Sequence, residues 1–124
     1  MKIIQFALLA AGLTAWLEAH GPAKGKAVDF TAAVVDTGCY LSHDSKGPSH
    51  AACAETCAKA GVPLALLDEK TGVVYLPIAS DHKNQNERLM PFLEKRVKVT
   101  GTVVIKGGMT GIAIKTLTAV PAAI

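Results

Sequence analysis

Two long stretches of the chain alternate between apolar and polar or small residues. From residue 28 to residue 34 every second position is apolar, and the same period of two recurs over residues 96–106. This period is typical of a strand with one face against a core. Gly101 lies in the middle of the second stretch, where a small barrel needs a bulge or a sharp bend. Both stretches therefore predict strands of a curved sheet.

Shorter apolar runs predict three more strands. Residues 62–67 and 73–78 flank a polar turn that ends in Gly72, which is the pattern of a hairpin whose glycine adopts a positive φ. After Gly107 and Gly108 turn the chain, a last strand is predicted from Ile112 to near Leu117.

Two segments have the composition of helices. Residues 49–60 are rich in alanine and are followed by Gly61, which predicts a helix capped by Ser49. A second, short helix is predicted after Asn84, which could form a capping box with Glu87. Its apolar stripe continues to Leu93, and Pro91 would bend or restart it.

The order of these elements predicts a mainly β fold. Without residues 38–61 it is β-β-β-α-β-β, the order of the OB-fold, a five-stranded Greek-key barrel. The chain resembles small exported bacterial OB-fold proteins over residues 28–120, and residues 97–104 match their fourth strand. We therefore expect an OB-fold-like domain over residues 27–124, with a helical Cys/His insert over residues 38–61 after the first strand and a short helix between strands 3 and 4.

The amino-terminal residues have the pattern of a secretory signal peptide. Lys2 precedes a mostly apolar stretch over residues 3–17, and a cut after Ala19 is expected. The alternative is an uncleaved membrane anchor formed by residues 3–17. Either predicts a periplasmic or secreted domain, joined through a linker over residues 20–26. A cut after Ala19 would expose His20, whose amine and ring could chelate copper.

Length and charge limit the other functions. The 124 residues predict one domain, and the net charge of +3 comes from 13 basic and 10 acidic residues spread along the chain. Without a basic block or interleaved aromatic residues, no nucleic-acid partner is expected. No phosphate loop, nucleophile elbow or paired-carboxylate site is present, so the sequence does not indicate an enzyme and no catalytic residue is predicted.

The candidate chemistry is concentrated in residues 38–61, which contain all three cysteines. His50, Cys53 and Cys57 are spaced by three and then four residues, so they share one face of the predicted helix, and Cys39 joins them from the end of the first strand. Thiolates with an imidazole suit zinc, and thiolates also suit Cu⁺. We therefore predict a copper or zinc ion at these four residues. Possible additional ligands are His43, His82 and His20.

The cysteine spacing leaves alternatives open. The Cys-x-x-x-Cys pair with a histidine is similar to copper-delivery proteins of cytochrome oxidase assembly, which carry it on a thioredoxin fold. A disulfide from Cys39 to Cys53 would close a loop of about fifteen residues and stabilise the fold by roughly 3 kcal/mol. Cys39 to Cys57 is the other pairing. Such a disulfide-stapled module could dock on another exported or membrane protein.

The same cysteines raise the questions of thiol redox chemistry and of haem attachment. Cys53 lies near the start of the predicted helix, where the dipole favours a thiolate, so a thiol redox protein is a third hypothesis. Ala58 follows Cys57, so the Cys-x-x-Cys-His motif is missing and covalent haem is not expected.

Overall fold

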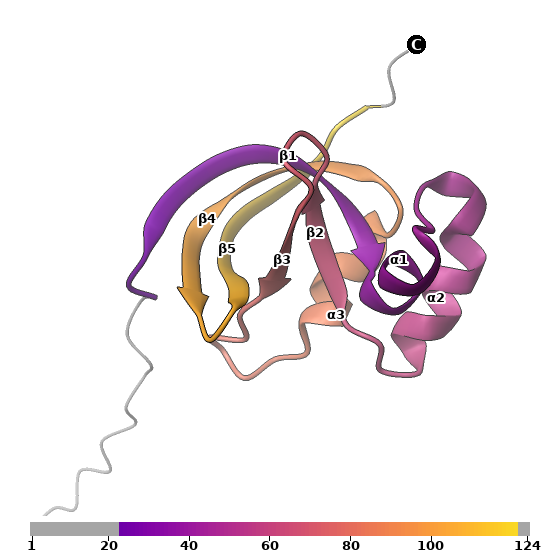
Figure 1. Cartoon of the computed structure of the whole chain (residues 1–124), viewed down its shortest axis with the longest axis horizontal. Coiled ribbons are helices and arrows are strands. Elements are labelled where there is room, and N and C mark those ends of the chain that lie inside the picture. The colour runs from indigo at the N-terminus through magenta and orange to yellow at the C-terminus, as the bar shows by residue number, and fades with distance from the viewer. Residues whose placement is uncertain (1–22, 122–124) are drawn as a thin grey trace, which may run out of the picture.

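Five strands close into a barrel in the computed structural model, which describes residues 23–121 (Figure 1). The strands pair in the order β1-β2-β3-β5-β4, and β4 pairs with β1 to close the barrel. Only the β3–β5 pair is parallel. The predicted OB-fold-like barrel is therefore confirmed. The strands are β1 (Lys26–Asp36), β2 (Leu64–Asp68), β3 (Val73–Pro77), β4 (Arg96–Lys106) and β5 (Met109–Ala119).

The bend expected in the fourth strand is present. The register between β4 and β5 shifts between Thr100 and Gly101, as a bulge requires. A side chain at Gly101 would collide with the carbonyl oxygen of Ala113, so the two strands approach too closely there for any residue but glycine. The bulge lets these long strands curve around the core.

Short helices connect the strands in two places. Between β1 and β2 lie α1 (Thr37–His43), the 3-10 turn η1 (Pro48–His50) and α2 (Ala51–Lys59). Between β3 and β4 lie α3 (Gln85–Leu89) and the 3-10 turn η2 (Met90–Phe92). Figure 1 shows α1 and α2 side by side next to the ends of β1 and β2. The predicted insert after the first strand and helix before the fourth strand are thus both present.

The insert differs from the prediction in two respects. The chain forms α1 directly after β1, where the pattern predicted only a strand end and a loop. Ser49 does not cap α2, because Pro48 starts a 3-10 turn that carries Ser49, and His50 becomes the residue before the helix. Two boundaries also move: β1 begins at Lys26, inside the predicted linker, and β5 extends from Met109 to Ala119.

One hydrophobic core joins the barrel, the insert and α3. Ala54 and Ala58 on α2 are buried in the same cluster as Leu64 on β2 and Leu89 on α3. The rest of that cluster comes mainly from the strands: Ala32, Val34, Leu66, Leu93, Val97, Val99 and Ile112. The alanine face of α2 is therefore fixed on the barrel, and this positions the cysteines of the same helix.

The ends of the insert meet beside the barrel. The backbone N–H of Thr37 donates to the carbonyl oxygen of Pro63 at 3.0 Å, and the Thr37 hydroxyl donates to the same oxygen at 2.9 Å. β1 and β2 therefore pair as neighbours despite the residues between them.

The predictions for the amino terminus lie outside the described residues. These are the signal peptide or anchor over residues 1–19, the ligand candidate His20 and the linker residues 20–22. Within residues 23–121, no helix has the length and apolar character needed to cross a membrane.

Candidate metal centre

The three cysteines converge as free thiols. The Sγ atom of Cys39 lies 3.9 Å from that of Cys53 and 3.9 Å from that of Cys57, and all three sulfurs lie within 4.8 Å of one another. A tetrahedral ion bound at about 2.3 Å from each sulfur would hold them about 3.8 Å apart. The observed spacing therefore suits a shared metal ion.

The same distances bear on the two disulfide pairings. A disulfide would bring two sulfurs to about 2.05 Å. In the structure Cys39 is bonded to neither partner, and its equal distances to Cys53 and Cys57 favour neither pairing. The three residues are thus one cluster centred on Cys39.

Local structure fixes each sulfur. Cys53 and Cys57 are four residues apart on α2, so their side chains leave the same face of the helix. Cys39 lies on the first turn of α1, where its backbone N–H donates to the Oδ1 atom of Asp36 at 2.8 Å. This bond caps α1 and holds Cys39 opposite the cysteine face of α2.

His50 approaches the cluster from η1, with its Nδ1 atom turned to two acids. This nitrogen lies 2.9 Å from Oε1 of Glu94 and 3.7 Å from Oδ2 of Asp36. Asp36, Cys39 and His50 form a second group whose ligand atoms lie within 4.8 Å of one another. Cys39 belongs to both groups, so the two groups adjoin, and Cys39, His50, Cys53 and Cys57 lie close enough to bind a metal.

The histidine and both acids are withdrawn from solvent. The side chains of His50, Asp36 and Glu94 are 12%, 0% and 1% exposed. Two polar atoms in this group are buried without a hydrogen-bond partner, namely Nε2 of His50 and Oδ2 of Asp36. Buried polar atoms are nearly always paired in folded proteins, so an unpaired nitrogen on an imidazole grouped with Cys39 has the character of a metal ligand.

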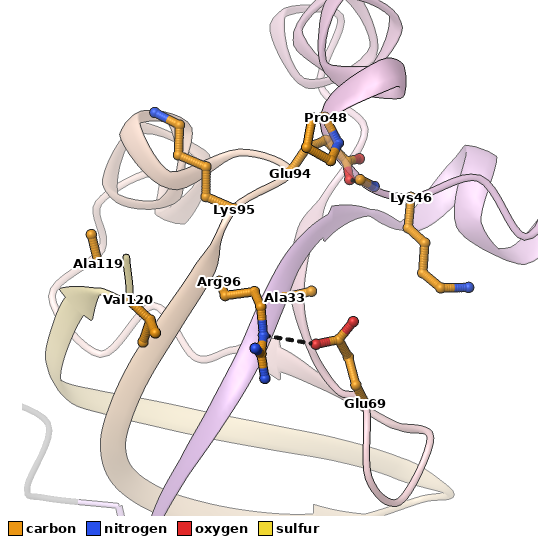
Figure 2. Close-up of a pocket in the computed structure, with 10 residues that line it drawn as sticks. Ala33, Lys46, Pro48, Glu69, Glu94, Lys95, Arg96, Ala119 and Val120 are labelled. Atoms are coloured by element: carbon orange, nitrogen blue, oxygen red, sulfur yellow. Dashed lines mark hydrogen bonds and ion pairs between the residues drawn. The ribbon is translucent and has the colours of Figure 1, made fainter. Parts of the chain in front are cut away.

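Two hydrogen bonds to the backbone of other segments hold Glu94 in place. It adopts a positive φ of 56°, and its N–H donates to the carbonyl oxygen of Val34 at 2.9 Å. Its Oε2 atom accepts the backbone N–H of Gly47. Figure 2 shows the carboxylate beside Pro48, at the start of the turn that carries His50.

Burial and neighbouring groups favour the protonated forms of Cys39 and His50. The pKa of the Cys39 thiol is raised to about 12, first by burial and then by hydrogen bonds with Cys53 and Cys57 and the charge of Asp36. The pKa of His50 is also raised, chiefly by its hydrogen bond with Glu94, while burial opposes this rise. Cys53 contributes to the rise too, although Nε2 makes no hydrogen bond of ordinary geometry. A metal ion must displace these protons to bind.

The other predicted ligands lie away from this cluster. His43 is exposed on the last turn of α1, and His82 is exposed in the loop between β3 and α3. Neither belongs to a potential metal-binding group within residues 23–121. The structure thus brings together the four principal ligands and neither of these two.

Sequence reasoning missed both acids at the site. Glu94 is 44 residues from His50, so no local spacing could relate them. Asp36 did carry a signal, because an Asp after an apolar strand and three residues before Cys39 is typical of a helix cap.

A pocket of about 550 Å³ adjoins the site. It lies between the segment from Lys46 to Pro48 and the segment from Glu94 to Arg96, as Figure 2 shows. The Nε atom of Arg96 pairs with Oε2 of Glu69 at 3.1 Å within it. Glu94 therefore belongs both to the pocket wall and to the surroundings of His50.

Comparisons of the chain with protein-family models, with curated proteins and with solved structures gave no match. The fold and the cluster of thiols, imidazole and acids therefore carry the functional argument.

Proposed function

We propose that this chain is an exported metal-binding protein that holds one Zn²⁺ or Cu⁺ ion at Cys39, His50, Cys53 and Cys57. The observation that carries the proposal is the convergence of three free sulfurs, with Cys39 at 3.9 Å from the other two. Three thiolates and an imidazole form a complete tetrahedral donor set for zinc, and thiolates are preferred ligands of Cu⁺.

The site's position in the barrel supports a binding function. The insert lies in the first loop of an OB-fold-like barrel, and OB-folds bind ligands through this loop and the adjacent face. The resemblance to small exported bacterial OB-fold proteins and the apolar pattern of residues 3–17 support a periplasmic or secreted location. A protein partner would then be another exported or membrane protein.

Metal stoichiometry tests this function. We expect the purified, reduced protein to bind about one Zn²⁺ or Cu⁺ per chain, because the donor set encloses one position. Elemental analysis after removal of free metal measures the ratio. Cys53→Ser should abolish binding, since it removes one of three thiolates.

The matched control is Ala52→Ser, which places the same hydroxyl one residue earlier on an exposed position of α2. This variant should bind metal as the unaltered protein does. A reduced, folded protein that takes up neither metal would contradict the proposal.

A disulfide-stapled module is the second candidate, because Cys39 lies 3.9 Å from both other thiols. It predicts a mass two hydrogens lower without reductant and a single alkylatable thiol. The raised pKa of Cys39 weighs against a reactive thiol at this residue, because a reactive thiol needs a lowered pKa. The thiol redox hypothesis for Cys53 stays a prediction.

A further inference from the structure

We propose that Glu94 fixes the proton of His50 on Nδ1, so that Nε2 is the fourth metal ligand, and that this pair makes the site selective for Zn²⁺ over Cu⁺. The inference deepens the proposed function and rests on it, because it concerns the same ion-binding position.

The position of Glu94 makes it a positioning residue for His50. Its Oε1 atom is 2.9 Å from Nδ1 of His50, and its Oε2 atom accepts the N–H of Gly47. Both carboxylate oxygens are thus engaged, in a side chain that is 1% exposed. A carboxylate only accepts hydrogen bonds, so the nitrogen facing it must carry the proton.

This arrangement leaves one nitrogen for a metal. A neutral imidazole with its proton on Nδ1 has its lone pair on Nε2. Nε2 of His50 is buried and has no hydrogen-bond partner. Histidine ligands in metal proteins commonly donate their second N–H to a carboxylate, which fixes the ring and raises its basicity. The His50–Glu94 pair has these features before any ion is added.

The fourth donor distinguishes the two metals. Structural zinc sites are almost always tetrahedral with four protein ligands, whereas soft thiolates alone are suited to Cu⁺. Loss of His50 would therefore leave zinc with three protein ligands and leave the thiolates for Cu⁺ intact.

Charge favours the same ion. Three thiolates with Zn²⁺ carry one net negative charge, and with Cu⁺ they carry two. Asp36 and Glu94 are buried beside this site, so the smaller negative charge meets less repulsion. Both the donor number and the charge balance point to zinc.

Competition with metal chelators tests the selectivity. The full, reduced chain is titrated with Zn²⁺ and separately with Cu⁺, as the unaltered protein, Glu94→Gln and His50→Ala. We expect Glu94→Gln to weaken zinc binding by about 10- to 100-fold, the usual effect of removing such a carboxylate. Cu⁺ affinity should not fall, because the thiolates stay intact and one of the two buried negative charges beside them is removed. Equal losses for the two metals, or an unchanged zinc affinity, would overturn the inference.

Glu69→Gln is the matched control, because Glu69 is an acid on the same pocket wall that pairs with Arg96 and not with His50. It should leave the affinities for both metals unchanged. Circular dichroism of each variant establishes that the barrel is folded before the titrations are compared.

The tautomer of His50 is measured separately, without a variant or a metal. Nitrogen-15 NMR of the metal-free protein, at a pH high enough to leave the ring neutral, should find the proton on Nδ1. A proton on Nε2 would overturn the role of Glu94. A protein that binds no metal but has this tautomer contradicts the proposed function, and with it the zinc selectivity, but leaves the role of Glu94 in fixing the proton intact. A protein that binds zinc equally well with Gln at position 94 contradicts the inference alone.

Discussion

At the scale of single residues, Asp36 connects the barrel to the metal centre. It is the last residue of β1 and is completely buried. Its Oδ1 atom accepts the N–H of Cys39, while its Oδ2 atom lies 3.7 Å from Nδ1 of His50. One side chain therefore starts α1, positions the central thiol and places a carboxylate near the imidazole.

Replacing this acid should separate its capping role from its charge. We expect Asp36→Ala to lower the free energy of unfolding of the metal-free protein by about 1–2 kcal/mol, because Cys39 loses the acceptor for its N–H. Asp36→Asn should cost less, since Asn caps helices about as well as Asp. Urea denaturation measures both. Equal losses in the two variants would show that the charge matters and the cap does not.

The principal ligands of the site were accessible from the sequence because their relations are local. Cys53 and Cys57 follow His50 at helical spacing, and Cys39 lies at the start of the same insert. Glu94 was not accessible, since it reaches His50 only after β4 has paired with β1. A short-range pattern contains no information about a contact between residues that are 44 positions apart.

At the scale of elements, Asn86 joins α3 to the insert and to β2. Its Nδ2 group donates to the carbonyl oxygens of Ala58 at 3.2 Å and Val62 at 2.8 Å. Its Oδ1 atom accepts the N–H of Leu64 at 2.8 Å. A single amide therefore satisfies backbone groups where α2 ends and where β2 begins.

Loss of this amide should destabilise the junction. We expect Asn86→Ala to lower the free energy of unfolding by about 1–3 kcal/mol, because partly buried backbone groups lose their partners. Thermal unfolding followed by circular dichroism measures the effect. Glu87→Ala, at an exposed position on the same helix, is the control and should change stability by less than about 0.5 kcal/mol. Equal effects would contradict the role of Asn86.

The strands were easier to predict than the first helix for a physical reason. In β4, Val97 and Val99 are buried and Lys98 between them is not, and β1 buries Ala32 and Val34 but not Ala33, so the apolar period of these strands is visible in the sequence. α1 has no buried residue, and its Leu41 is 78% exposed. It depends on Asp36 at its start and on the left-handed conformation of Asp44 at its end. Hydrophobic periodicity could not reveal a helix that buries nothing.

At the scale of the whole molecule, the metal centre draws on distant parts of the chain. Its donors lie on α1, η1 and α2, while Asp36 ends β1 and Glu94 precedes β4. The buried core contains none of the four proposed ligands. We therefore expect the metal-free protein to keep its barrel and a bound metal to stabilise the whole fold.

Mass action gives the size of this stabilisation. With free zinc at a hundred times its dissociation constant, the free energy of unfolding should rise by about 2.7 kcal/mol, provided that the unfolded chain does not bind the ion. Urea denaturation with and without zinc measures the difference, and Cys53→Ser should show none. Stoichiometric binding without any gain in stability would mean that the unfolded chain binds zinc equally well.

The hydrogen bonds from Thr37 to Pro63 have a consequence for a protein whose backbone is cut within the insert. They close the base of the insert, so a break in the backbone between Asp44 and Ser45 would leave each half attached to its own strand. Cys39 would belong to the fragment with β1, and the remaining donors to the fragment with β2. Neither fragment would have a complete set of ligands, and only strand pairing would reunite them. Metal capture could thus report the reassembly of a split barrel.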